Sequence, residues 1–73
     1  MNKFYSYYKA VIDEAEKNNP KLSAKYQEAE TLIAQQAAMV SQGRVTSHDA
    51  GLFIEDYLIT CYDLSVDDMR LTL

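Results

Sequence analysis

Two residues of the chain could form a nucleophile and its general base, Cys61 and His48. They stand thirteen positions apart, which is roughly 20 Å along one continuous helix. A thiol and an imidazole act together only within hydrogen-bond reach, so the spacing argues against a catalytic dyad. His48 also has Gly51 and Leu52 at the helical positions where further metal ligands would have to stand. We therefore expect Cys61 to be a buried structural residue and His48 to be an exposed residue in a first helical turn.

Acidic side chains are the other candidates for chemistry, in the adjacent pairs Glu55-Asp56 and Asp67-Asp68. Neighbours on a helix diverge by about 100°, and acid–base catalysis needs a partly dry site that separates the two pKa values. Residues 63–68 place oxygen ligands as a calcium loop does, but Asp68 stands where the loop needs glycine. The two glycines of the chain leave no phosphate-binding loop. The sequence predicts no enzyme activity, no cofactor and no metal.

The net charge of −4 is distributed unevenly along the chain. Lysines and acids cancel over residues 1–43, whereas residues 45–69 contain no Lys or Arg. An acidic surface repels nucleic-acid phosphates and attracts basic protein surfaces, so we expect a basic protein partner and no direct nucleic-acid binding. The acids of this second stretch are Asp49, Glu55, Asp56, Asp63, Asp67 and Asp68.

The expected compartment follows from cysteine usage and hydropathy. One cysteine cannot form an internal disulfide, whereas secreted domains of this size usually depend on several. The N-terminal residues lack the apolar stretch of a signal peptide, and no run is long enough to span a bilayer. We expect a cytoplasmic protein with no membrane association.

Helix signals divide the chain into one all-α domain over residues 1–73. Asn19 before Pro20 is a typical N-cap with proline in the first helical position, Gly43 is a typical residue to follow a helix, and Thr46 is a second N-cap. The prediction is a small three-helix bundle with a short C-terminal fourth helix, over about 2–18, 20–42, 47–62 and 66–71.

Apolar residues at three- and four-residue steps define the face that each helix should bury. Gly51, inside the third helix, costs roughly 1 kcal/mol against alanine and suggests close approach of a neighbouring helix. The predicted core is Phe4, Tyr8, Val11, Ile12 and Ala15 in the first helix, Leu22, Tyr26, Ala29, Ile33, Ala37 and Val40 in the second, and Ala50, Phe53, Ile54, Tyr57, Leu58 and Cys61 in the third.

The third helix is also apolar on its opposite side, where Leu52 and Ile59 stand seven residues apart. Either the segment from Val66 to Leu73 folds back over this pair, or the pair is the apolar centre of a binding surface. The acids Glu55, Asp56 and Asp63 border it and suit a partner with basic surroundings. The N-terminal tyrosines Tyr5 and Tyr7 are further candidates, because tyrosine is a common interface anchor.

These features favour a small acidic protein-binding module that acts stoichiometrically as an inhibitor or adaptor. Size and charge also fit phage or mobile-element proteins that block a host factor, some by imitating nucleic acid, and we hold this origin as a hypothesis. Two alternatives stay open. In one, Leu52 and Ile59 meet their own copies in a homo-oligomeric structural or regulatory protein. In the other, the second and third helices form a DNA-binding helix-turn-helix regulator, against which the acidic third helix argues.

Overall fold

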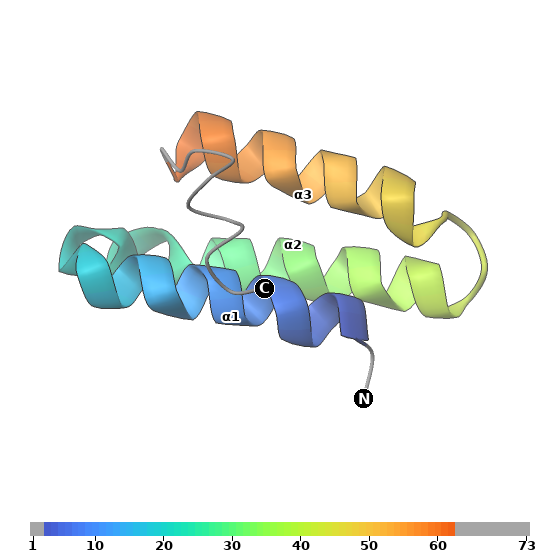
Figure 1. Cartoon of the computed structure of the whole chain (residues 1–73), viewed down its shortest axis with the longest axis horizontal. Helices are drawn as coiled ribbons and strands as arrows, with labels where there is room; N and C mark the ends of the chain where they lie inside the picture. Colours follow the sequence, from blue (N-terminus) through green and yellow to red (C-terminus); the bar gives the residue numbers. More distant parts are fainter. Residues whose placement is uncertain (1–2, 63–73) are drawn as a thin grey trace.

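A computed structural model describes residues 3–62 of the chain. Over this range the protein is all-helical, with α1 at Lys3–Asn18, a 3₁₀ turn η1 at Pro20–Leu22, α2 at Ser23–Ser41 and α3 at Ser47–Cys61. Successive helices run antiparallel, and α2 packs against both α1 and α3 (Figure 1). The predicted all-α class and its three helices are confirmed. The fourth helix predicted at 66–71 lies outside the described residues.

The turn between α1 and α2 is fixed by its asparagine and proline. The Asn19 side chain accepts a hydrogen bond from the Lys21 N–H at 3.3 Å, and Pro20 opens the following turn. That turn is a 3₁₀ turn, in which the Leu22 N–H donates to the Asn19 carbonyl at 3.0 Å. The predicted helix from residue 20 therefore begins as η1 and becomes α-helical only at Ser23, as helix N-termini often do.

The turn between α2 and α3 carries both signals that the sequence predicts. Gly43 has a φ of 73°, which favours glycine. Its N–H donates to the Val40 carbonyl and the Arg44 N–H donates to the Met39 carbonyl, both at 3.0 Å, which is a Schellman motif. Three residues later, the Thr46 hydroxyl accepts the Asp49 N–H at 3.1 Å and caps α3. The orientation of α3 is thus set locally at its first turn.

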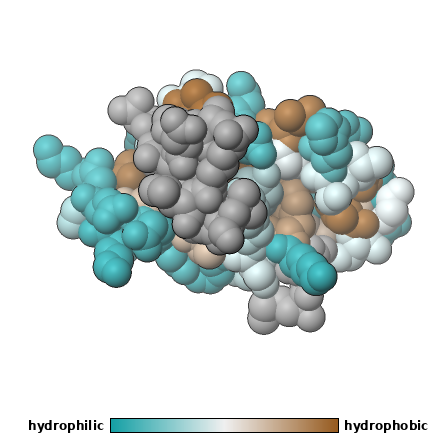
Figure 2. Space-filling model, viewed as in Figure 1, coloured by the Kyte–Doolittle hydropathy of each residue, from teal (hydrophilic) through white to brown (hydrophobic). Residues whose placement is uncertain are grey.

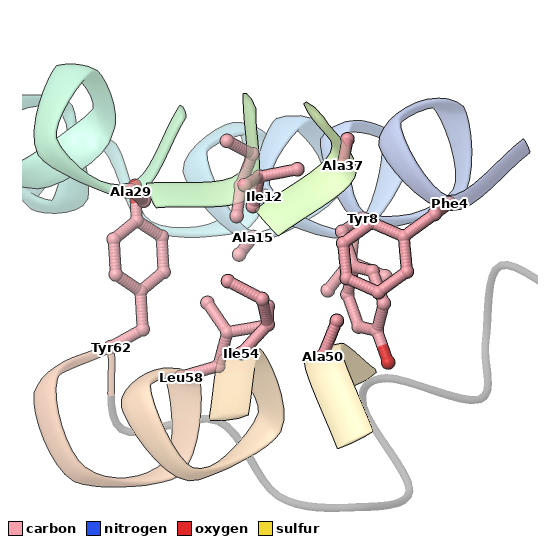
Figure 3. Packing of buried hydrophobic residues seen from close by; sticks show 12 residues of the cluster. Phe4, Tyr8, Ile12, Ala15, Ala29, Ala37, Ala50, Ile54, Leu58 and Tyr62 are labelled. Atoms are coloured by element: carbon pink, nitrogen blue, oxygen red, sulfur yellow. The ribbon is translucent and has the colours of Figure 1, made fainter. Parts of the chain in front are cut away.

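The core lies between the inward faces of the three helices (Figure 3). The whole predicted stripe of α1 is buried. The core's margins are formed by half-buried residues, namely Leu22 in η1, Tyr26 and Val40 on α2, and Tyr57 on α3. Figure 3 shows α3 contributing Ile54 and Leu58 opposite α1. The buried residues are Phe4, Tyr8, Val11, Ile12, Ala15, Ala29, Ile33, Ala37, Ala50, Ile54, Leu58 and Tyr62.

Two residues predicted to be buried in α3 are exposed. Phe53 is 49% exposed, because it stands one residue, or about 100°, from the buried row of Ala50, Ile54 and Leu58. Cys61, the last residue of α3, is also exposed. The prediction of a buried cysteine is wrong because the next residue, Tyr62, fills that end of the core instead and is 1% exposed.

Candidate protein-binding face of α3

Three large hydrophobic side chains of α3 lie at the surface. Leu52, Phe53 and Ile59 are 54%, 49% and 45% exposed, and they are the exposed large hydrophobic residues of the described chain. Figure 2 shows hydrophobic side chains reaching the surface along the edge of the molecule that α3 occupies in Figure 1. Single exposed hydrophobic residues are ordinary, but three on one helix form a patch of the kind that marks interaction sites.

Two acidic residues alternate with Leu52 and Ile59 along one side of α3. Asp49, Leu52, Asp56 and Ile59 are all exposed and follow one another at steps of three, four and three residues, a spacing that keeps side chains on one face of a helix. Neither carboxylate has a hydrogen-bond or ion-pair partner among residues 3–62. No Lys or Arg occurs in residues 45–62. We call this line, together with Phe53, the outer face of α3.

Glu55 has a different role from the one its position in the sequence suggests. It is half-buried, and its carboxylate accepts a hydrogen bond from the Tyr8 hydroxyl at 2.9 Å. Burial and then this hydrogen bond raise the pKa of Tyr8 well above its usual value, so the hydroxyl stays a donor at neutral pH. The Tyr8 hydroxyl also lies against Gly51, where a Cβ would stand 3.0 Å from it. What approaches Gly51 closely is thus the end of the Tyr8 side chain from α1, and Glu55 joins α3 to α1.

Tyrosine hydroxyls join the other helices to one another in the same way. Each of three further tyrosines donates to an acid on a neighbouring helix, so every pair of helices shares at least one such hydrogen bond. The sequence does not reveal these pairs, because their members are 13 to 29 positions apart and only packing brings them together. They are Tyr5 with Glu30 at 3.5 Å, Tyr57 with Glu28 at 3.1 Å, and Tyr26 with Asp13.

A lysine completes the contact between α1 and α2. Lys9 donates to the Tyr26 hydroxyl at 2.8 Å and forms an ion pair with Asp13 at 3.5 Å. The hydrogen bond to Tyr26 raises the pKa of Lys9, and the hydrogen bond to Asp13 raises the pKa of Tyr26. The charges of Lys9 and Asp13 therefore balance each other within the fold, whereas the outer face of α3 carries acidic charges alone.

The remaining predicted binding residues lie away from the outer face of α3 or beyond the described range. Tyr5 is half-buried and bonded to Glu30. Tyr7 is half-buried, and its ring packs edge-on against Tyr8 with centroids 4.7 Å apart. Asp63 lies outside the described residues, as does the segment that was the alternative cover for Leu52 and Ile59. Among described residues, the structure brings together Leu52, Asp56 and Ile59. It adds Phe53, which periodicity had assigned to the core, and Asp49, one of the acids of the second stretch.

The residues considered for catalysis are separated on the surface. His48 and Cys61 are both exposed and belong to the one unbroken helix α3, so the separation inferred from their spacing holds. Among residues 3–62, His, Cys, Asp and Glu form no group of three or more that could hold a metal ion. Within the same range, none of the helices combines the length and the hydropathy needed to cross a membrane.

The fold and this face define a small all-helical bundle with one acidic and apolar outer surface. Comparison with known proteins finds no matching family model, no similar curated protein and no similar solved structure. Evidence for the function therefore comes from the chemistry of the chain's own residues.

Proposed function

We propose that the protein is a stoichiometric protein-binding module, an inhibitor or adaptor, that contacts its partner through the outer face of α3. The observation that carries the proposal is the combination on one helix of three half-exposed hydrophobic residues, Leu52, Phe53 and Ile59, with carboxylates that have no partner among residues 3–62 and with no basic residue. An apolar centre beside charged groups is how protein interfaces are built, with affinity from the centre and orientation from the rim.

The size of the patch indicates how such binding would work. Leu52, Phe53 and Ile59 are each about half exposed. A partner that covers them removes apolar surface from water, which favours binding by a free energy of roughly 25 cal/mol per Å² buried. The acids Asp49 and Asp56 would steer a basic surface toward the face and disfavour acidic competitors. Covering a partner's basic surface, or holding it beside another molecule, needs no chemistry from this chain.

Charge also distinguishes this proposal from self-association through the same face. A parallel pair of α3 copies would bring Asp49 and Asp56 against identical acids, and an antiparallel pair would bring them against apolar residues. No basic residue of the helix could compensate in either case. Like charges across an interface are costly. A basic partner is therefore favoured over the homo-oligomer, which the test below detects directly.

The first test is the solution mass of wild type and of a Leu52→Glu, Ile59→Glu variant, measured by light scattering after size exclusion. The matched control is Gln35→Glu, Ala38→Glu, which adds the same charges at two exposed positions of α2. The proposal expects a monomeric wild type and two variants that remain equally helical. A wild-type dimer that only the α3 variant dissociates would assign the face to self-association. An α3 variant that unfolds while the control stays folded would assign the pair to the core.

The second test places a photo-crosslinking amino acid at Ile59, and at Gln35 as control, in cells that express the protein. The proposal expects a crosslinked protein partner at position 59 that is absent at position 35 and is lost with Leu52→Glu. The same products from both positions would contradict it.

A further inference from the structure

The spacing of the outer face matches a coiled-coil seam. Steps of three, four and three residues place Asp49 and Asp56 at successive a positions of a heptad and Leu52 and Ile59 at successive d positions. This line runs on the opposite side of α3 from the buried row of Ala50, Ile54 and Leu58. The helix therefore carries two seams, of which the inner one is filled by α1 and α2.

The residue types in the outer seam specify the helix that could fill it. Leu52, at a d position, suits a two-stranded pair, whereas a charged residue at an a position selects its partner at a cost in stability. A parallel second copy of α3 would set Asp56 against Asp56. An antiparallel copy would set it against Leu52 or Ile59 and leave the carboxylate buried without a partner, which is unfavourable. A cation facing each aspartate removes both problems.

The residues beside the seam fit a long basic side chain. Phe53, at the neighbouring e position, is 49% exposed. Lysine and arginine can lay their aliphatic stems over an apolar surface while the charged end reaches a carboxylate. On the other side of the seam Glu55 is already bonded to Tyr8, so Asp49 and Asp56 are the carboxylates of the seam left to receive a cation.

We infer that the partner presents one amphipathic helix, with Leu or Ile alternating with Lys or Arg, which pairs with α3 as a short two-stranded coiled coil. The inference rests on the proposed function and adds the class of partner to it. The described seam covers about three helical turns, so the interface is small and belongs to the weak, transient class. Its affinity falls as salt rises, because Asp49 and Asp56 are exposed.

Synthetic peptides test this inference directly on the full chain. Two peptides of about three heptads carry Lys and Leu in the seam, one with Lys at a and Leu at d for a parallel pair, the other reversed for an antiparallel pair. Two control peptides carry Asp in place of every seam Lys. Binding is followed by fluorescence anisotropy at low and at physiological salt, to wild type, to Asp56→Lys and to Glu14→Lys, which makes the same charge change at an exposed position of α1.

The expected result is binding of one Lys peptide to wild type, with the Asp peptides at least about tenfold weaker. Asp56→Lys should weaken the Lys peptide by about tenfold and strengthen the matching Asp peptide, while Glu14→Lys changes either by less than about twofold. Equal binding of Lys and Asp peptides, or equal effects of the two variants, would overturn the inference.

Different results would contradict the partner class and the proposed function. If no peptide binds but the crosslink at Ile59 still captures a partner, the face is a binding surface and the partner is not a basic helix. If neither the peptides nor the crosslinker finds a partner, both the inference and the proposed function are wrong.

Discussion

Acidic side chains have two different surroundings in this protein. Between the helices, Asp13, Glu28, Glu30 and Glu55 each accept a hydrogen bond from a tyrosine on a neighbouring helix. On the outer face of α3, the exposed carboxylates have no partner among residues 3–62. The first group stabilises the bundle, and the second contributes little to it. Net charge alone does not distinguish the two groups. Of the two, only the second has no partner within the part of the chain that the structure describes.

Alkaline pH should break the tyrosine–carboxylate hydrogen bonds between the helices and leave the carboxylates on the outer face of α3 unchanged. Burial raises the pKa of Tyr62 to about 12, and burial with a carboxylate contact raises the pKa of Tyr8 and Tyr57 further. Since the folded-state pKa exceeds the unfolded value of about 10, this stability is complete below pH ~10 and is lost as pH rises through the folded pKa. We expect cooperative unfolding above that pH, coincident with tyrosinate absorbance, in far-UV circular dichroism. Asp56→Asn should leave the midpoint of this transition unchanged. Ionisation of all six tyrosines near pH 10 in a protein that stays folded would contradict the proposed role of the buried hydroxyls.

The two sides of α3 should differ most in their tolerance of truncation. Leu58 is fully buried and Leu52 is 54% exposed, so the same substitution tests both faces. Leu58→Ala should lower the free energy of unfolding by about 2–5 kcal/mol, which rivals the whole stability of a domain this small. Leu52→Ala should change it by less than about 0.5 kcal/mol. Urea denaturation measures both, and comparable losses would show that Leu52 belongs to the core.

Removal of single tyrosine hydroxyls should have different effects on stability at Tyr8, whose hydroxyl donates a hydrogen bond to Glu55, and at Tyr62. Tyr8→Phe leaves the half-buried Glu55 without its donor and should cost about 1.5 kcal/mol. The Tyr62 hydroxyl is buried and has no hydrogen-bond partner among residues 3–62, so Tyr62→Phe should leave the unfolding free energy unchanged or raise it. Chemical denaturation of the two variants provides the comparison. A Tyr62→Phe loss as large as that of Tyr8→Phe would reveal a partner for the Tyr62 hydroxyl.

A smaller change in stability is expected for Gly51→Ala, and whether it stabilises or destabilises depends on the Tyr8 hydroxyl. Alanine is favoured over glycine in a helix by about 1 kcal/mol, but its Cβ would stand 3.0 Å from the Tyr8 hydroxyl. Gly51→Ala should therefore be neutral or destabilising in wild type and stabilising by about 1 kcal/mol in a Tyr8→Phe background. Thermal melts of the four proteins complete this double-mutant cycle, and additive effects would mean that the hydroxyl moves aside freely.

Local signals predicted the bundle better than they predicted its surface. Asn19, Gly43 and Thr46 act through neighbours in the chain, so their roles could be read directly. The stripe of α1 was equally clear because one face of that helix is buried. In α3 both faces carry hydrophobic residues, and periodicity could not tell which margin Phe53 belonged to or that Tyr62 would replace Cys61. Their positions depend on where α1 and α2 lie.

The tyrosine–carboxylate pairs were beyond the reach of the sequence for a related reason. Tyr8 and Glu55 are 47 positions apart, and nothing in either local segment marks them as partners. Tyr5 and Tyr7 were candidate interface anchors by residue type alone. In the structure, four tyrosine hydroxyls each donate a hydrogen bond to an acid on another helix, those of Tyr5, Tyr8, Tyr26 and Tyr57. The candidate face was predicted in part, because Leu52, Asp56 and Ile59 share a spacing that survives any packing arrangement.

The division of α3 into two faces also bears on how this protein can evolve. The cap at Thr46, the buried row and the Tyr8–Glu55 hydrogen bond maintain the helix without help from Leu52, Asp56 or Ile59. Substitutions at those three positions should therefore be close to neutral for folding, and under the proposed function selection would act on them through binding. A lineage whose target changes could follow it by altering a few outward side chains, while the bundle that presents them stays the same.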